Sequence, residues 1–373
     1  MAPKNITAPH LQVDLELSST RPATKPASRA KDIERTMKEV HRAFGATSVC
    51  LLSDLPRVRA RSTGLLALDV ATGIGGWPNG RVIEVYGPDS SGKTTLALSA
   101  VASAQRDGSY GVFVDADQAL DPSYAAILGV DPDRLLVISP STCEQAFESL
   151  DMLLRSGAVS IAVIDSLPAL VGRAEIEAEM GDDNEILQSR LVGQALRKLL
   201  GVLAMFGSNL IFINQIRRLQ NVVFGNPETT PGGNMLRAQA SLRIDLRSVK
   251  LLRRDDKLVG KRIRMKIAKN KVAAPFRRCE CDLLFGIGFS RSAQIFDMAR
   301  RADIIELQAD GFFFGTAWLG LDEGSVLRRI EVDIDLADRI EDLVRERLVD
   351  IALPLEASTP HAMDFDQREP DPG

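Results

Sequence analysis

Residues 87–94 read GPDSSGKT, and this segment constrains the fold more than any other part of the chain. It matches the phosphate-loop pattern G-x-x-x-x-G-K-[ST], in which backbone N–H groups of a glycine-rich loop surround phosphates. Residues 81–86 predict a strand before the loop, and residues 94–106 predict a helix after it. This order brings the loop N–H groups and the helix N-terminus to one anion site. The pattern predicts that Lys93 reaches the β- and γ-phosphates of a nucleotide and that the Thr94 hydroxyl binds Mg²⁺.

The pattern of apolar residues predicts an α/β protein with a central twisted, mostly parallel sheet. Apolar runs without alternation are typical of strands buried between helices, and they occur at residues 111–115, 135–139, 161–165 and 210–214. Helical stretches separate these runs, including residues 144–155 and 185–206. After residue 233 the strands follow one another directly. This change predicts antiparallel additions to the sheet at residues 241–246, 262–268 and 279–285.

The chain also divides into segments of different composition. Residues 1–31 mix Pro, Ser, Thr and Ala without a period, which predicts a disordered tail. Residues 55–290 form the predicted core, and residues 291–353 predict a small α+β C-terminal domain. Residues 354–373 predict an acidic, Pro-containing tail.

Residues 32–54 predict a helix and a short strand that have no local partner. One face of the helix is apolar and consists of Ile33, Met37, Val40 and Phe44. Residues 48–52 predict the strand. The apolar face must dock either on the core of its own chain or on a neighbouring subunit, and the pattern favours neither.

Polar side chains end several of the predicted parallel strands. Asp165 follows an apolar strand, where its carboxylate is expected to hold Mg²⁺ through water beside the loop. Asp115 and Asp117 end another strand, close enough for one of them to orient an attacking water. Asn214 and Gln215 close a third strand and place an amide where it can sense the γ-phosphate. Because the carboxyl ends of parallel strands meet at one edge of a sheet, we expect one nucleotide site there.

The charge of the chain is unevenly distributed, although its formal net charge is only −4. Residues 243–278 hold 14 Lys and Arg against three acids, a net charge of +11. Residues 321–373 hold six Arg against 15 acids, a net charge of −9. A segment at +11 is expected of a face that binds a polyanion such as nucleic acid. A strand edge protected by lysines and arginines is the alternative interpretation.

The composition also predicts where the protein works. No apolar run approaches the roughly 18 residues needed to span a bilayer, and the N-terminus has no hydrophobic secretion signal. The 4 cysteines are too few and too scattered for a disulfide framework. These features predict a cytoplasmic protein with reduced thiols and no membrane partner.

Several segments occur in an order typical of one family: GPDSSGKTT, DADQALDP, VIDS, FINQIR, FGNPETTPGGN and KNKVAAPF. With these segments, nearly the whole chain from Asp32 to Val349 resembles the bacterial RecA recombinases. Hexameric helicases share the phosphate loop, but they do not share FGNPETTPGGN or the N-terminal helix and strand. In the RecA family that helix and strand dock onto the adjacent subunit and build a helical filament. The resemblance therefore implies self-association through residues 32–54.

The resemblance implies a RecA-type ATPase core with ATP and Mg²⁺ as cofactors. The nucleotide contacts that it implies are Gly87, Pro88, Asp89, Ser90, Ser91, Gly92, Lys93, Thr94, Thr95, Asp121, Tyr124, Lys269 and Lys271. Within this set, Asp121 and Tyr124 match positions that contact adenine. Lys269 and Lys271 match a pair that reaches the ATP of the neighbouring subunit.

The resemblance also implies roles in metal binding and catalysis. Thr94 and Asp165 are the implied metal ligands. Asp117, Lys93 and Gln215 are the implied catalytic residues, and Gln215 matches the position that couples the γ-phosphate to DNA.

The family binds DNA through two loops, which correspond to about residues 177–190 and 216–234. The implied DNA contacts are Arg190, Arg197, Arg217, Phe224 and Arg243. The implied activity is filament formation on single-stranded DNA, followed by pairing and strand exchange with a homologous duplex. The family further implies that the filament promotes self-cleavage of a LexA-type repressor in the SOS response to DNA damage.

The chain departs from the family pattern at several functional positions. Asp117 replaces the catalytic Glu of the family and is one methylene shorter. In the DNA loops, residues 185–186 (Glu-Ile) and 220–221 (Gln-Asn) replace the usual residues, and Ala238 replaces an aromatic residue at the subunit contact. These departures leave a second interpretation open: a RecA paralogue that hydrolyses ATP slowly and acts as a regulatory or accessory DNA filament.

Overall fold

The computed structural model describes residues 26–45, 48–55, 58–179, 185–218, 228–254 and 256–350. Contacts divide the chain into two compact units, residues 1–57 and residues 58–373. Most of the predicted N-terminal tail and the whole predicted acidic tail lie outside the described residues. Among the helices of the described part, none is long and apolar enough to cross a membrane.

The N-terminal unit contains helix α1 (Pro26–Phe44) and the 3₁₀ helix η1 (Leu52–Asp54). α1 begins at Pro26, before the predicted start at Asp32. Proline suits the first position of a helix, because the N–H group that it lacks would have no hydrogen-bond partner there. The predicted strand at residues 48–52 is wrong for this single chain. A strand needs a second strand to receive its backbone hydrogen bonds, and none of the described strands pairs with this segment.

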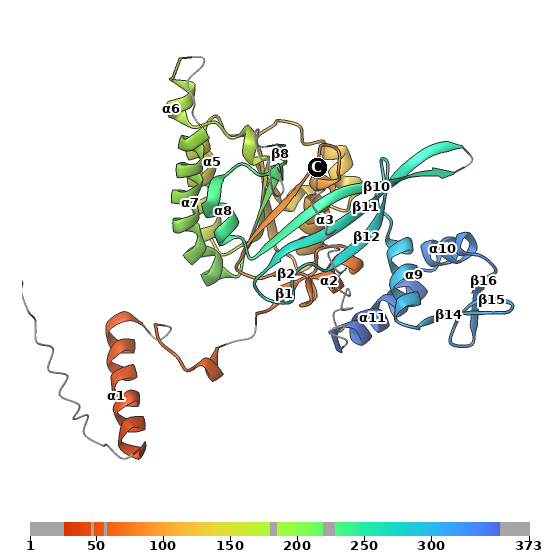
Figure 1. Ribbon diagram of the computed structural model, residues 1–373, viewed down its shortest axis with the longest axis horizontal. Helices are drawn as coiled ribbons and strands as arrows, with labels where there is room; N and C mark the ends of the chain where they lie inside the picture. Colours follow the sequence, from red (N-terminus) through yellow and green to blue (C-terminus); the bar gives the residue numbers. More distant parts are fainter. Residues whose placement is uncertain are drawn as a thin grey trace, which may run out of the picture. The chain divides into compact units, whose positions relative to one another are not determined.

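A nine-stranded sheet forms the centre of the second unit. Its strands are β3 (Val82–Gly87), β4 (Tyr110–Asp115), β5 (Leu135–Ile138), β6 (Val159–Asp165), β7 (Asn209–Gln215), β10 (Leu242–Arg254), β11 (Lys257–Asn270), β12 (Arg278–Leu284) and β13 (Gly288–Phe289). Their order is β13-β12-β11-β10-β3-β7-β6-β4-β5. Figure 1 labels β10, β11 and β12 of this sheet, which lie side by side. The strands from β10 to β5 run parallel, and β11, β12 and β13 are added antiparallel. The predicted mostly parallel sheet with antiparallel additions is confirmed.

Helices cover both faces of this sheet. The main ones are α2 (Leu66–Thr72), α3 (Lys93–Gln105), α5 (Cys143–Arg155), α7 (Glu185–Phe206), α8 (Gly233–Gln239) and α9 (Arg291–Arg301). α5, α7 and α8 lie together on one face (Figure 1) and share an apolar cluster with Val82 of β3. α2, α3 and α9 belong to a second cluster, which contains Ile83 and Val85 of the same strand. Because Val82 and Ile83 enter different clusters, apolar residues of β3 face both sides of the sheet.

The C-terminal elements belong to the same unit and pack against its core. They are the three-stranded antiparallel sheet of β14 (Ile305–Gln308), β15 (Gly311–Phe314) and β16 (Ala317–Gly320), with helices α10 (Glu323–Val332) and α11 (Ile334–Asp350). Arg345 on α11 donates a 2.9 Å hydrogen bond to the buried carboxylate of Asp69 on α2. This ion pair fixes α11 to the core.

Candidate functional site

The phosphate loop joins the end of β3 to the start of α3, as the sequence predicts. Gly92 has a φ of 89°, in the left-handed region, immediately before α3. A Cβ at Gly87 would lie 2.3 Å from the carbonyl oxygen of Leu246 on β10, so only glycine fits there. Glycine therefore shapes both ends of the loop, and the N-terminus of α3 faces it.

Lys93 is the first residue of α3, and its ammonium group contacts the loop. Nζ donates hydrogen bonds to the carbonyl oxygens of Gly87 at 3.1 Å and Pro88 at 2.8 Å. Burial lowers the pKa of Lys93, while the carboxylates of Asp89 and Asp165 act in the opposite direction. Lys93 thus places a cation against the loop, where the motif requires one.

Thr94 and Asp165 bring two oxygen atoms together beside the loop. Thr94 Oγ1 donates a 2.6 Å hydrogen bond to Asp165 Oδ2 at the end of β6. The pKa of Asp165 is raised to about 6, mainly by burial and also by the nearby carboxylates of Asp117 and Asp115, although the hydrogen bond from Thr94 and the charge of Lys93 act in the opposite direction. A hydroxyl and a carboxylate are the oxygen ligands that Mg²⁺ prefers, so this pair fits the predicted metal site.

The structure distinguishes the two acids that follow β4. Asp115 is buried, and its carboxylate accepts hydrogen bonds from the N–H groups of Ala119 at 3.0 Å and Leu120 at 3.1 Å. Asp117 is exposed, and its Oδ2 accepts a 3.0 Å hydrogen bond from Ser166 Oγ, next to Asp165. Asp115 therefore shapes the turn after the strand, whereas Asp117 lies at the candidate site.

The two residues matched to adenine contacts belong to one short helix and its N-cap, and one of them contacts α3. Asp121 begins helix α4 (Pro122–Ile127), and its carboxylate accepts from the N–H groups of Ser123 and Tyr124. The Tyr124 hydroxyl lies 3.0 Å from Thr95 Oγ1. This hydrogen bond connects α4 to the helix that follows the phosphate loop.

Gln215 ends β7 at the same edge of the sheet. It is exposed and lies opposite Gly87 in the parallel pairing of β7 with β3. Its backbone N–H donates to Asn214 Oδ1 at 3.1 Å. The structure therefore brings Lys93, Thr94, Asp165, Asp117 and Gln215 to one edge of the sheet, as the strand order of a parallel sheet requires.

Lys261 is a residue at this site that the sequence reasoning missed. Its ammonium group on β11 donates to the carbonyl oxygen of Ser90 in the phosphate loop and lies 5.9 Å from the ring centroid of Phe285. In the sequence, Lys261 is marked only by its place in the +11 segment. That place does not distinguish Lys261 from the other bases of the segment as a residue of the nucleotide site, because the passage of β11 beside the loop depends on the strand order.

The residues matched to DNA contacts have different surroundings. Arg190 and Arg197 are exposed on α7, and Arg217 is exposed in β8 (Arg217–Arg218). Phe224 and residues 219–227 of the second predicted DNA loop lie outside the described residues, as do residues 180–184 of the first. α7 thus displays two arginines that a phosphate backbone can reach.

Arg243, which the resemblance matches to a DNA contact, lies beside an acid of the sheet. Its Nε donates a 2.5 Å hydrogen bond to the buried carboxylate of Glu84, and its side chain is 18% exposed. The family resemblance implies that Arg243 contacts DNA, whereas in this single chain its charge is paired with Glu84 inside the sheet. Lys269 donates to the carbonyls of Arg237 and Ala238, and Lys271 donates to that of Gln239. In a single chain both lysines thus hold the C-terminal end of α8.

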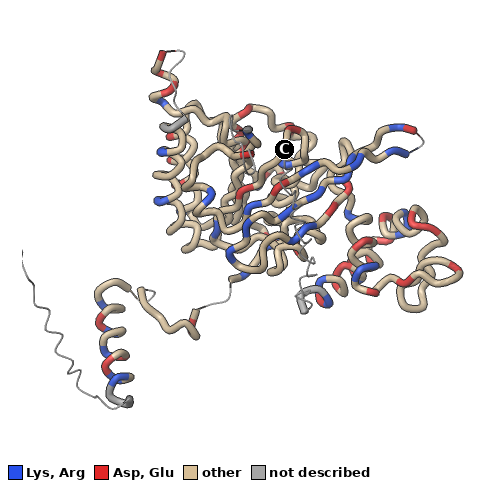
Figure 2. Tube along the Cα trace, in the orientation of Figure 1, with Lys and Arg blue, Asp and Glu red and all other residues tan. Residues whose placement is uncertain are grey.

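A basic ribbon is formed by β10 and β11. Figure 2 shows Lys and Arg along the outer part of this pair of strands, which extends beyond the sheet. Bases in this part are Lys250, Arg253, Arg254 and Lys257. These four bases are exposed and belong to the +11 segment, where a polyanion is expected to bind.

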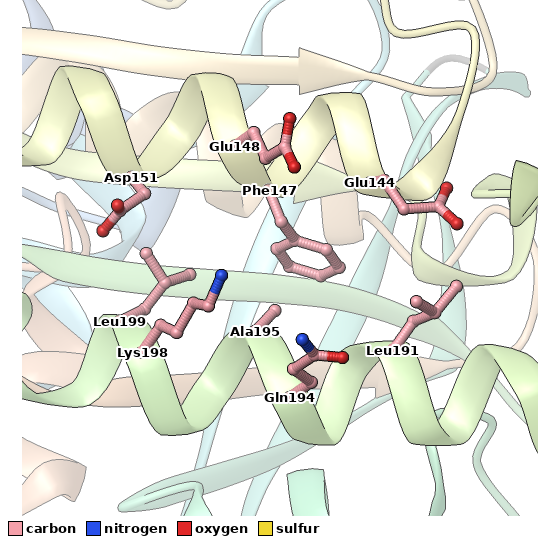
Figure 3. A pocket seen from close by; sticks show the side chains of 9 residues that line it. All are labelled: Glu144, Phe147, Glu148, Asp151, Leu191, Gln194, Ala195, Lys198 and Leu199. Carbon is pink, nitrogen blue, oxygen red and sulfur yellow. The ribbon is translucent and has the colours of Figure 1, made fainter.

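A groove lies between α5 and α7 (Figure 3), and no residue of the phosphate loop lines it. Its volume is about 120 Å³, and its apolar lining residues are Phe147, Leu191, Ala195 and Leu199. Glu144, Glu148 and Asp151 line it from α5, with Gln194 and Lys198 on α7. None of these lining residues was predicted to bind nucleotide or DNA.

The fold and the site define a phosphate-loop nucleotide-binding protein of the α/β class. Comparison with known proteins narrows this class, because residues 31–290 match the RecA N-terminal domain. Protein RecA of Acidothermus cellulolyticus is 48% identical over 322 residues, which cover 86% of this chain and 93% of that protein. Protein RecA of Methylobacterium sp. (strain 4-46) is 45% identical over 350 residues, which cover 93% and 96%. The chain belongs to the RecA family. This membership supports a role in DNA recombination and repair.

Proposed function

We propose that this chain is a DNA-dependent ATPase that forms filaments on single-stranded DNA and catalyses homologous pairing and strand exchange. The observation that carries the proposal is the meeting of Lys93, Thr94 and Asp165 at the phosphate loop of a RecA-family chain. The strand that pairs with the duplex is read by base pairing, so the protein needs contacts to phosphates rather than to base edges.

ATP and Mg²⁺ are the proposed cofactors. Lys93 binds the β- and γ-phosphates, and Thr94 and Asp165 hold the metal. The metal, when bound, neutralises charge that develops on the phosphates. Asp117 accepts a proton from the attacking water, and Gln215 contacts the γ-phosphate from the end of β7.

Self-association is proposed to use two exposed apolar surfaces. α1 exposes Ile33 and Phe44, which are 57% and 79% accessible. β5 is the last strand of the nine-stranded sheet and exposes Leu136 and Val137. An uncovered edge strand accepts another strand. Residues 48–52 of a neighbouring subunit supply that strand, which explains why it does not form in one chain.

Binding of DNA is proposed to use the basic ribbon of β10 and β11 together with exposed arginines of α7. Single-stranded and double-stranded DNA both present phosphates to such a surface. Self-cleavage of a LexA-type repressor on the filament, and a cytoplasmic location, follow from the family resemblance.

The proposal is tested by ATP hydrolysis with and without single-stranded DNA, together with electron microscopy of the complexes. Wild-type protein is expected to hydrolyse ATP faster with DNA and to form helical filaments. Lys93→Ala removes the cation that faces the phosphates, so neither DNA-stimulated hydrolysis nor ATP-dependent filaments are expected. Normal ATP-dependent filaments of Lys93→Ala would contradict the assignment of the site.

A slow-hydrolysing accessory filament is the second candidate function. It is favoured by Asp117, because the carboxylate is shorter than the Glu of the family and accepts a hydrogen bond from Ser166. An accessory filament binds ATP and DNA but does not exchange strands when it is the only protein present. Hydrolysis and strand exchange measured on the same preparation separate the two functions.

A further inference from the structure

Glu84 is a buried carboxylate near the middle of the sheet, and both of its oxygens have partners. Its exposed fraction is 0%. Oε1 accepts a 2.9 Å hydrogen bond from Asn214 Nδ2, and Oε2 accepts a 2.5 Å hydrogen bond from Arg243 Nε. β3 lies between β7 and β10 in the sheet, so Glu84 receives one side chain from each neighbouring strand.

The two side chains that hold Glu84 also hold two consecutive residues at the end of the second predicted DNA loop. Asn214 Nδ2 donates to the carbonyl oxygen of Pro231 at 2.9 Å. Arg243 Nη2 donates to Thr230 Oγ1 at 3.3 Å, and Thr230 is itself buried. One carboxylate therefore fixes Thr230 and Pro231 through two separate side chains.

The two side chains that hold Glu84 also have contacts at or next to the nucleotide site. Asn214 Oδ1 accepts the backbone N–H of Gln215, the residue that we place at the γ-phosphate. The guanidinium of Arg243 lies 4.8 Å from the ring centroid of Tyr86, which directly precedes Gly87 of the phosphate loop. Both partners of Glu84 thus contact the end of the DNA loop. Asn214 also contacts Gln215 of the nucleotide site, and Arg243 contacts the residue that precedes the phosphate loop.

We infer that Glu84 is a positioning residue that couples nucleotide binding to the second DNA loop. This inference rests on the proposed DNA-dependent ATPase function. Removal of one partner from a buried ion pair leaves the other charge buried and unpaired, so Arg243 must move when the charge of Glu84 is lost. Its movement breaks the hydrogen bond to Thr230 Oγ1, while the Thr230 carbonyl oxygen still accepts from Arg237 Nη2 at 3.1 Å. Energetic coupling between two binding sites is reciprocal, so the loss is visible from either site.

The test is the affinity for a fluorescent ATP analogue with Mg²⁺, measured with and without single-stranded DNA. Glu84→Gln keeps the size of the side chain and an acceptor for Asn214, but it removes the charge that holds Arg243. In the wild type, DNA is expected to tighten nucleotide binding. In Glu84→Gln that effect is expected to fall by about 10-fold, while the affinity without DNA stays within about 2-fold. A purely structural role of Glu84 would lower stability without changing the ratio of the two affinities.

Two further variants complete the test. Thr230→Val removes the far contact of Arg243 and leaves the pair with Glu84 intact, so it is expected to reduce the same ratio. Asp282→Asn removes the negative charge that pairs with another arginine of the sheet, Arg262, whose Nε donates to Asp282 Oδ1 at 2.6 Å, and it is expected to leave the ratio unchanged. If Glu84→Gln shows no cooperative unfolding transition, it is not folded, and the ratio measured with Thr230→Val then tests the inference.

An unchanged ratio in both Glu84→Gln and Thr230→Val would overturn the inference while the proposed function stands. An equal loss in Asp282→Asn would also overturn it, because the effect would then not depend on the residues that hold Thr230 and Pro231. A wild-type protein that binds nucleotide with no response to DNA would instead contradict the proposed function.

Discussion

Thr94 Oγ1 donates a hydrogen bond to Asp165 Oδ2 at 2.6 Å, between residues that are 71 positions apart in the sequence. This bond joins the start of α3 to the end of β6 and places two oxygen ligands beside the ammonium group of Lys93. The proposed ATP and Mg²⁺ chemistry depends on this relationship.

Asp165→Asn is the first prediction. The substitution keeps an acceptor for Thr94 but removes the negative charge, so the affinity for ATP in the presence of Mg²⁺ is expected to fall. A charged hydrogen-bond partner contributes about 1.5–3 kcal/mol, which corresponds to about 10- to 100-fold. Calorimetric titration with and without Mg²⁺ measures the change. Asp151→Asn on α5 is the control, and an Asp165→Asn protein with normal Mg²⁺ dependence would refute the assignment.

Asp117→Glu is the second prediction. Asp117 accepts a hydrogen bond from Ser166, and it is one C–C bond shorter than the acid of the family. We expect Asp117→Glu to raise DNA-stimulated turnover at saturating ATP, because the longer side chain reaches the attacking water more easily. Asp117→Asn is expected to slow turnover by at least about 100-fold, the usual contribution of a general base. A Glu variant no faster than wild type would show that the shorter side chain is already accommodated.

The third prediction concerns Lys269 and Lys271, which donate to the C-terminal carbonyls of α8. Replacement of both by Met is expected to lower the free energy of unfolding by about 1 kcal/mol, because each cation stabilises a helix C-terminus by a fraction of that value. ATP binding by the monomer is expected to persist. DNA-stimulated hydrolysis is expected to disappear, because the family resemblance matches these two lysines to a pair that reaches the ATP of the neighbouring subunit.

Mixed filaments test whether these lysines act on the ATP of a neighbouring subunit. Subunits in which Lys269 and Lys271 are both replaced by Met are mixed with Lys93→Ala subunits. At some interfaces the first kind then supplies an intact phosphate loop and the second kind supplies intact lysines. Partial recovery of hydrolysis supports a shared site. No recovery at any mixing ratio would argue against it.

The fourth prediction concerns thiol reactivity. Cys50 is exposed, whereas Cys143, Cys279 and Cys281 are buried. Burial raises the pKa of Cys143 to about 12, so its reactive thiolate form stays scarce at pH 8 and at pH 9. A chromogenic disulfide reagent is expected to react rapidly with one thiol in the native protein and with all 4 in denaturant. Cys50→Ser should remove the rapid phase. Rapid reaction of Cys143 in the native protein would contradict the packing of α5.

Local patterns were sufficient to predict the phosphate loop, the strand before it and the helix after it. Lys93, Thr94 and Asp165 were predictable because the motif fixes their spacing and parallel strands end at one edge. The roles of Glu84 and Lys261 were not predictable in this way. Both depend on β3 lying between β7 and β10, which are distant from it in sequence. The pairing of β3 with β10 also brings β11, the next strand after β10, near the phosphate loop, and chain order alone does not give that strand order.

Arg243 and residues 48–52 show two other limits of the sequence. Arg243 belongs to a basic segment, and the acid that pairs with it lies in the otherwise apolar run of β3, where no charge pattern marks it. Residues 48–52 have the composition of a strand, but a strand forms only where another strand pairs with it. That partner is not found among the described residues of the same chain.

Strand exchange by this protein alone tests the central claim most directly. Circular single-stranded DNA and a homologous linear duplex are incubated with ATP, Mg²⁺ and either wild-type protein or Lys93→Ala. The account predicts joint molecules with the wild type that depend on ATP, and none with Lys93→Ala. Wild-type filaments that hydrolyse ATP but yield no joint molecules would contradict the recombinase function and leave the accessory filament as the function of this chain.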